Sequence, residues 1–188
     1  DVAREISEGL ARAIVSASYN GTVVETKTPL NENGELVLYT FNDAAGKQAF
    51  WHSSAHLLAQ ALEQLYPGIK LTIGPAIESG FYYDVDTGEH TITEKDLAVI
   101  EKRMLELARG KHEFSMREAS KADALTFYEN AGNEYKTELI ENLEDGTITF
   151  CDHDDFTDLC RGGHIPNTGI VKAVKLTNIA GAYWRGDE

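Results

Sequence analysis

Hydrophobic residues follow helical spacing in some stretches of the chain and strand spacing in others. Apolar residues four positions apart predict a helix over residues 2–10, with Asp1 as its N-cap. Runs rich in β-branched and aromatic residues predict three short strands, at 13–19, 22–24 and 35–40. Asn20-Gly21 is typical of a two-residue hairpin turn. These elements predict a small α+β unit that ends in the polar, turn-forming stretch 42–46.

The rest of the chain has the pattern of a larger α+β domain. A core stripe of Ala and Leu predicts a helix over 47–66, ended by Pro67-Gly68. Two further helices are expected. The first begins at a Thr93 cap, with Asp96 three residues later, and ends at Gly110; the second begins at Ser120 and ends at about Gly132. Strands are expected at 70–77, 80–85, 147–151, 172–179 and 182–185. The prediction is α+β: domain 1–43, then domain 44–188 with a mostly antiparallel sheet packed by helices.

Composition narrows the possible partners and compartments. The 188 residues carry 31 acids and 17 bases, a formal net charge of −14, which argues against broad binding of a phosphate backbone. Two cysteines are too few for a disulfide framework, so a reducing, cytoplasmic setting is the simpler expectation. No apolar run approaches a membrane span. Neither G-x-x-x-x-G-K-[ST] nor G-x-G-x-x-G occurs, so this stretch offers no ATP or dinucleotide motif.

Two pairs of metal-ligating residue types are the main candidate chemistry. His52 and His56 are four apart at the head of the predicted helix and therefore share one face. Cys160 and His164 bracket Arg161-Gly162-Gly163, a tight-loop sequence. Together the four make a complete zinc set, or three ligands and a water, if the two halves meet across a cleft. The plainer interpretation is a surface histidine, a satisfied core histidine and a small buried cysteine.

Lys136 and Asp158 are weaker candidates. A lysine such as Lys136 is ordinarily solvated; its alternative is a cation aimed at a phosphate or a developing oxyanion. Asp158 is ordinarily a surface acid; its alternative is a partner for a histidine or an anchor for a substrate ammonium. The acidic run 152–155 lacks EF-hand spacing and is interpreted as a polar loop. His90 and His112 are given no role, and Cys151 is expected to be strand packing.

Five motifs follow one another along the whole chain: His52-Ser53-Ser54-Ala55-His56-Leu57-Leu58, Gly74-Pro75-Ala76-Ile77, Gly80-Phe81-Tyr82-Tyr83-Asp84, Asp158-Leu159-Cys160-Arg161-Gly162-Gly163-His164 and Gly181-Ala182-Tyr183-Trp184-Arg185-Gly186-Asp187. Their order resembles that of the N-terminal region of bacterial-type threonyl-tRNA synthetases. The resemblance implies a partial TGS-like (β-grasp) unit, an editing domain and the lead into an aminoacylation domain that lies outside this chain. It implies hydrolysis of mischarged seryl-tRNA(Thr), in support of accurate threonyl-tRNA synthesis.

By the same resemblance, the editing residues fall on His52, His56, Lys136, Asp158, Cys160 and His164. The imidazoles would position water and handle protons, and Lys136 would stabilise charge near the terminal adenosine or the tetrahedral intermediate. Asp158 would hold the seryl ammonium or hydroxyl, and Cys160 would line the serine pocket. The sequence departs from the family at Ser54, often Cys there, and at Gly163, often Pro, which could make the His164 loop more mobile.

Cofactors and partners are also implied by the resemblance. No zinc is required at the editing site, where His52, His56, Cys160 and His164 are latent ligands, although zinc could bind there. A catalytic zinc and ATP binding are expected in the absent catalytic domain. The partner is the acceptor end of tRNA(Thr) with its seryl ester; the full enzyme is expected to be a homodimer, whereas this piece alone could be a monomer. Alternatives are a free-standing zinc-dependent aminoacyl-tRNA hydrolase and a non-catalytic tRNA-binding module.

Overall fold

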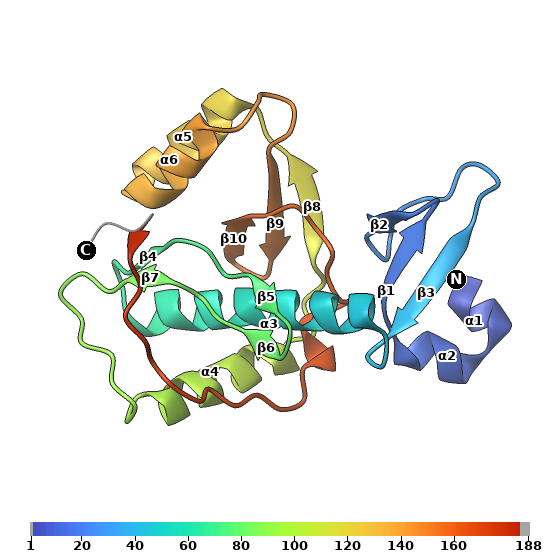
Figure 1. Ribbon diagram of the computed structural model, residues 1–188, viewed down its shortest axis with the longest axis horizontal. Helices are drawn as coiled ribbons and strands as arrows, with labels where there is room; N and C mark the ends of the chain where they lie inside the picture. The colour runs from blue at the N-terminus through green and yellow to red at the C-terminus, as the bar shows by residue number, and fades with distance from the viewer. Residues whose placement is uncertain (1, 185–188) are drawn as a thin grey trace.

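A computed structural model describes residues 2–184, and its mixture of helices and antiparallel strands confirms the predicted α+β class (Figure 1). The first part of the chain contains α1 (Val2–Ile6), α2 (Glu8–Ala13), β1 (Ile14–Tyr19), β2 (Thr22–Val24) and β3 (Leu36–Thr40). The remainder contains α3 (Ala44–Leu65), β4 (Lys70–Leu71), β5 (Ala76–Ile77), β6 (Gly80–Phe81), β7 (Val85–Asp86), α4 (Leu97–Arg109), β8 (Ser115–Glu118), α5 (Lys121–Asn130), α6 (Glu134–Glu141), β9 (Thr149–His153), β10 (Phe156–Leu159) and the 3-10 helix η1 (Thr168–Ile170).

The N-terminal unit, which we define as residues 2–43, is an antiparallel sheet of order β2-β1-β3 preceded by two short helices. The hairpin at Asn20-Gly21 is confirmed, because both residues have the positive φ (49° and 78°) that such a turn requires. The predicted single opening helix is instead broken at Ser7, whose side chain accepts the N–H of Leu10 and caps α2. The Asp1 cap lies outside the described residues.

Helix α3 is the centre of the molecule. Its residues 53–62 are all buried, so every face of this stretch packs against protein. Figure 1 shows α4 along one side of α3, the β8–β10 strands on the other, and the N-terminal unit at the start of α3. Val15 of β1 and Ala49 of α3 belong to the same hydrophobic cluster as the α4 core residue Met104. The N-terminal unit is therefore docked on the α3 core; a TGS-like domain ending at residue 43 stays a prediction.

The sheet of the larger part is smaller than the sequence predicted. Its three antiparallel strands have the order β10-β9-β8, while β4 pairs with β7 and β5 with β6 as separate two-stranded pieces. The strands predicted over 70–77 and 80–85 are interrupted, and Pro75 in the first of them has no N–H to donate to a ladder. Strands β8 and β10 and helix α6 were missed, since their short segments show little hydrophobic periodicity.

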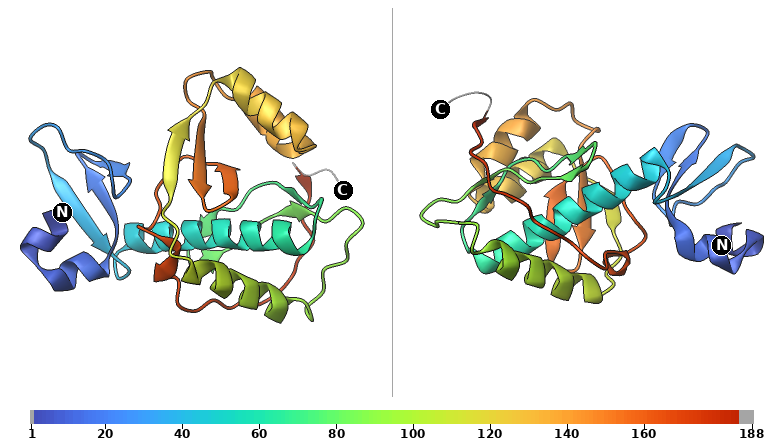
Figure 2. Two further views of the ribbon diagram at one scale, coloured as in Figure 1. Left: turned by 180° about the vertical axis from the view of Figure 1, so that it is seen from behind. Right: turned by 60° about the horizontal axis from the view of Figure 1, so that its bottom comes forward.

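The strand predicted over residues 172–179 was wrong. This segment has no strand pairing and is attached to α4 instead, beside which it runs in Figure 2. The backbone N–H of Leu176 donates to Glu101 of α4 at 2.8 Å, and the ammonium of Lys175 pairs with the same carboxylate at 2.9 Å. Its apolar residues pack against the α4 core rather than joining a sheet. The strand predicted at 182–185 is also absent over 182–184, and Arg185 lies outside the described residues.

The helix boundaries agree better with prediction. Ser120 caps α5 by accepting the N–H of Asp123, and Gly110 follows the last residue of α4, as expected. The Thr93 cap is corrected: α4 begins at Leu97, and the Asp96 carboxylate accepts both the N–H and the hydroxyl of Thr93. In the described part of the chain, no helix is both long and apolar enough to span a bilayer.

Candidate active site

The two histidines of α3 face one another, as their spacing predicts. The Nε2 atoms of His52 and His56 are 3.1 Å apart, with His56 buried and His52 half-buried. The small residues Ser53 and Ser54 between the two histidines are buried and leave no open face on this side of α3. Ser53 is fully buried, and its hydroxyl donates to the carbonyl of Ala49 and accepts the N–H of Ile165 at 3.0 Å. A serine here lets the His164 loop pack close to α3.

Cys160 and His164, the second predicted pair, lie beside His52 and His56. Cys160 Sγ lies 3.3 Å from His52 Nε2 and 3.3 Å from His164 Nε2. The loop between them has φ of 91° at Gly162 and 88° at Gly163, values that favour glycine, so the predicted tight loop is confirmed. Segments more than a hundred residues apart therefore place two histidines, a thiol and a third histidine around one point.

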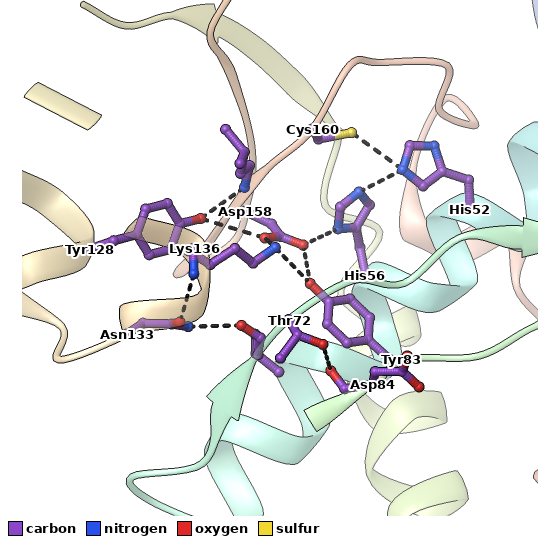
Figure 3. A network of polar contacts seen from close by, with 12 residues as sticks. His52, His56, Thr72, Tyr83, Asp84, Tyr128, Asn133, Lys136, Asp158 and Cys160 are labelled. Carbon is purple, nitrogen blue, oxygen red and sulfur yellow. Dashed lines mark hydrogen bonds and ion pairs between the residues drawn. The ribbon is translucent and has the colours of Figure 1, made fainter. Parts of the chain in front are cut away.

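A buried charged network continues from this cluster and is centred on Asp158 (Figure 3). Lys136 Nζ donates to Asp158 Oδ1 at 2.6 Å, and the Tyr83 hydroxyl donates to Oδ2 at 2.5 Å. His56 Nδ1 lies 3.2 Å from Oδ2, an ion-pair distance with an off-axis angle rather than a well-aligned hydrogen bond. The Tyr128 hydroxyl is 3.5 Å from Oδ1. Asp158 is thus surrounded by donors and links the histidine cluster to Lys136.

Lys136 and Asp158 are not the surface residues that their types would ordinarily be. Each side chain is only 3% exposed. Lys136 is held on α6, whose start is capped by Asn133, and the Asn133 amide also donates to the carbonyl of Leu71 at 2.9 Å. Asp158 lies on β10, with alternate residues Phe156 and Asp158 buried. A buried lysine is stable here because its charge is paired with the carboxylate.

Burial sets the protonation of the cluster. Desolvation lowers the pKa of His52 to about 3, and the charges of His56 and His164 act in the same direction. Desolvation also lowers the pKa of His56, although Asp158 opposes it. For Asp158, burial would raise the pKa, but the Lys136 ammonium and the His56 contact outweigh it and hold the pKa well below its usual range. Desolvation raises the pKa of Cys160 to about 12, so it is a neutral thiol at pH 7.

A cleft of about 560 Å³ leads to the cluster from the side of the N-terminal unit. It lies between β1–β2, the start of α3 and the loop 161–163. Among the four clustered residues, His52 lines this cleft, and Glu25 and Arg161 are also on its walls. A ligand entering here would meet His52 first.

Comparison with known proteins gives one consistent result. Over all of its length, the chain is 67% identical to a threonine--tRNA ligase of Flavobacterium johnsoniae and 65% identical to that of Flavobacterium psychrophilum. It is 56% identical to the threonine--tRNA ligase of Parabacteroides distasonis. Its strong homologues are bacterial threonine--tRNA ligases. The chain spans 29% of the length of these relatives, and residues 148–188 match the family described as the threonyl and alanyl tRNA synthetase second additional domain.

Three residues around the cluster were missed or misplaced by sequence reasoning. Tyr83 lies within one of the five motifs, but the sequence predicts no role for it. Its ring packs against Gly74, where an added Cβ would lie 2.1 Å from Tyr83 Cδ2. His153 was assigned to a polar loop but is buried in β9, near His56, and among the described residues neither of its ring nitrogens has a hydrogen-bond partner. Glu25 lies in the N-terminal unit, and no local sequence signal joins it to the site.

The cluster fits a tetrahedral metal ion. The ligand atoms of His52, His56, Cys160 and His164 all lie within 4.8 Å of one another. Zinc bonds of about 2.1 Å to nitrogen and about 2.3 Å to sulfur place ligand atoms roughly 3.4–3.6 Å apart. The shortest separations here, 3.1 and 3.3 Å, are close to this, and the wider ones, up to 4.8 Å, would have to close around an ion. A zinc held by all four would have no open position for water, whereas a catalytic zinc needs one. The donor set therefore suits a closed site better than a hydrolytic zinc centre.

Proposed function

We propose that this chain is the editing region of a threonine--tRNA ligase and that it hydrolyses mischarged seryl-tRNA(Thr). One observation carries the proposal: His52, His56, Cys160 and His164 converge beside the buried Lys136–Asp158 pair at the end of a cleft. Gathering six polar and ionisable side chains, five of them buried and His52 half-buried, is costly for a fold and is typical of a chemical site. The similarity to threonine--tRNA ligases supports the assignment to this class.

The chemistry of serine explains why such a site is needed. Serine differs from threonine by one methyl group, and a methylene-sized difference gives roughly 1–3 kcal/mol of discrimination in a synthetic pocket. A second site that excludes threonine by the bulk of its methyl group would hydrolyse the serine ester after serine has been transferred to tRNA(Thr). The reaction is attack of water on an ester, which needs a positioned water and stabilisation of the oxyanion.

The neutral imidazoles are suited to binding and positioning the attacking water. Because the pKa values of His52 and His56 are lowered, both rings are uncharged near pH 7 and can accept hydrogen bonds. His52 faces the cleft, where it would orient the attacking water and take up its proton. The Asp158 carboxylate next to His56 favours a proton on His56 Nδ1 and leaves Nε2 as the acceptor.

Lys136 and Asp158 would act on the seryl group and the developing charge. The Lys136 ammonium is desolvated, which strengthens its attraction to an oxyanion. Asp158 would hold the seryl ammonium, which would take the place of one of the donors that now surround the carboxylate. Cys160, as a neutral thiol, would line the serine pocket rather than attack the ester.

The test is deacylation of seryl-tRNA(Thr) and threonyl-tRNA(Thr) by the 188-residue chain and by the His52→Ala variant. We expect selective loss of the seryl ester by the unmodified chain and a loss of at least roughly a hundredfold in the variant. His90→Ala, altering a histidine outside the cluster that contacts the Pro67 carbonyl, is the matched control and should leave the rate unchanged. A chain that binds tRNA but hydrolyses neither ester would instead be a non-catalytic binding module.

A zinc-dependent hydrolase is a second candidate, favoured by the donor set alone. His52, His56, Cys160 and His164 would hold the ion, which when bound would supply a polarised water only if one of the four were displaced. A chelator arm in the same assay separates the two. Deacylation that survives exhaustive chelation supports the metal-free site; deacylation that is lost and then restored by zinc supports the second candidate.

A further inference from the structure

A glutamate of the N-terminal unit enters the histidine cluster from outside. Glu25 directly follows β2, and its Oε1 atom accepts the backbone N–H of Gly163 at 2.7 Å. The same oxygen lies 3.2 Å from His164 Nδ1. His164 has no exposed side-chain surface and Glu25 has 22%, so the contact is largely removed from water. Two nitrogen atoms, 138 and 139 residues away in sequence, therefore converge on one carboxylate oxygen.

The loop is shaped for this contact. Gly163 has φ of 88°, a conformation that side-chain-bearing residues rarely adopt, and its N–H points at Glu25. Proline has no N–H and a fixed negative φ, so it could not make the same bond. Gly162 leaves room as well, because a Cβ there would lie 3.0 Å from Glu25 Oε1. The glycine pair thus gives Glu25 access to the ring of His164.

The Glu25 contact bears on which nitrogen of His164 carries the proton, because it is the nearer of two groups at Nδ1: Glu25 Oε1 lies at 3.2 Å and the Cys151 thiol at 3.9 Å. An ionised carboxylate only accepts hydrogen bonds, so it favours a proton on Nδ1 and leaves Nε2 as an acceptor. His164 Nε2 is the atom that faces Cys160 Sγ at 3.3 Å, and a thiol can donate to it. On the other side of the cluster, Asp158 Oδ2 also lies 3.2 Å from a ring nitrogen, His56 Nδ1, but without the alignment of a hydrogen bond. Each of these two imidazoles therefore has one acidic residue beside Nδ1, and only at His164 is the contact a hydrogen bond.

We propose that Glu25 is a positioning residue of the hydrolytic site: it holds His164 in the Nδ1-protonated form and makes the cluster depend on the N-terminal unit. The proposal rests on the proposed function. Carboxylates that orient a functional histidine through its far nitrogen typically change activity by about 10–100-fold when removed. The Phe114 ring, stacked on His164 at 5.0 Å, fixes the plane of the imidazole but cannot select its tautomer.

The same segment offers a matched control. Lys27, two residues after Glu25, forms an ion pair with Glu113 that attaches the segment to the larger part of the molecule. Both of these side chains are more than half exposed and neither contacts His164. Lys27→Met therefore loosens the segment without touching the histidine, whereas Glu25→Ala removes the acceptor. Glu25→Gln removes the charge but keeps an oxygen that can accept from Gly163 and His164.

The first experiment needs no catalysis. Long-range proton–nitrogen NMR spectra of the 188-residue chain, with His164 assigned through a His164→Gln variant, report the tautomer directly. We expect the Nδ1-protonated form in the unmodified chain, in Lys27→Met and in Glu25→Gln, and a mixture or the opposite tautomer in Glu25→Ala. An Nε2-protonated His164 in the unmodified chain, or a spectrum unchanged by Glu25→Ala, overturns the proposal.

The second experiment measures seryl-tRNA(Thr) deacylation by the same variants. Glu25→Ala should lower kcat by about tenfold or more with KM within about twofold, and Glu25→Gln should recover most of the loss. Lys27→Met should behave as the unmodified chain. Equal losses in Glu25→Ala and Lys27→Met would assign Glu25 a merely structural role. If the unmodified chain has no deacylase activity, the proposed function fails, while the NMR spectra still decide whether Glu25 sets the His164 tautomer.

Discussion

Replacing Lys136 by methionine tests whether the buried ion pair has the strength that its geometry implies. The Lys136 ammonium lies 2.6 Å from Asp158 Oδ1, and each side chain is 3% exposed. Removing one partner of a buried pair leaves an uncompensated charge, which costs about 3–5 kcal/mol. The Tyr83 hydroxyl and His56 remain beside the carboxylate and reduce the penalty. We therefore expect Lys136→Met to lower the free energy of unfolding by about 3 kcal/mol.

The penalty should depend on pH with a definite sign. Without the lysine charge, the pKa values of Asp158 and His56 both rise, since Lys136 lowers both in the native protein. The folded variant then binds a proton that the unfolded chain at neutral pH does not bind. Under this condition stability falls as pH rises, so the deficit of Lys136→Met should be larger at pH 8 than at pH 5.

Urea unfolding followed by circular dichroism, at pH values from 5 to 8, measures this prediction. The control is Lys70→Met, which breaks the exposed pair with Glu134 and should lower the free energy of unfolding far less than Lys136→Met does. The double variant with Lys136→Met and Asp158→Asn removes both charges and should recover much of the loss. A single variant within 1 kcal/mol of the native protein, or a double variant no more stable than the single one, would refute the reasoning.

Three further predictions concern titration, packing and thiol reactivity. Acidification from pH 6.5 to about 3 should lower the free energy of unfolding, because the unfolded chain protonates His153 and the folded chain does not. His153→Phe should reduce the change of unfolding free energy with pH by about 1.4 kcal/mol per pH unit. Urea unfolding at a series of pH values measures this change. Gly46→Ala should cost about 2–3 kcal/mol, because a Cβ there would lie 1.9 Å from the Thr40 carbonyl oxygen. In the control Gly9→Ala, the added Cβ would make only an ordinary contact, 3.9 Å from Ser7 Oγ, so thermal unfolding should show a neutral or slightly stabilising effect. Iodoacetamide at pH 8 should alkylate Cys160 at least roughly a hundredfold more slowly in the native chain than in urea, because burial raises the pKa of the thiol. Peptide mass spectrometry measures the rate of alkylation.

Each of these three has an outcome that contradicts it. An unchanged acid slope in His153→Phe would mean that the imidazole is protonated in the folded chain. A Gly46→Ala variant as stable as Gly9→Ala would show that β3 can move away from α3. Rapid native alkylation of Cys160 would mean that the thiol is solvated and ionised rather than buried and neutral.

The sequence by itself determined the features that depend on neighbours along the chain. The spacing of His52 and His56 places both on one helix face whatever surrounds the helix. Asn20-Gly21 and the Gly162-Gly163 pair adopt the backbone conformations that glycine-rich turns favour. The α+β class followed in the same way from the alternation of helical and strand periods, and the resemblance of motifs agreed with the homologues.

Only the tertiary structure decided which polar groups leave water. Lys136 and Asp158 are common surface residue types, and nothing adjacent in sequence marks them as buried. The same is true of His153 in its acidic run and of Glu25, which reaches His164 across 139 positions. The segment 172–179 has a strand-like pattern yet packs on α4, because an apolar alternation specifies a buried side but not the partner that covers it. Solvation and protonation depend on neighbours brought together by folding, and this long-range proximity is not encoded in any local window.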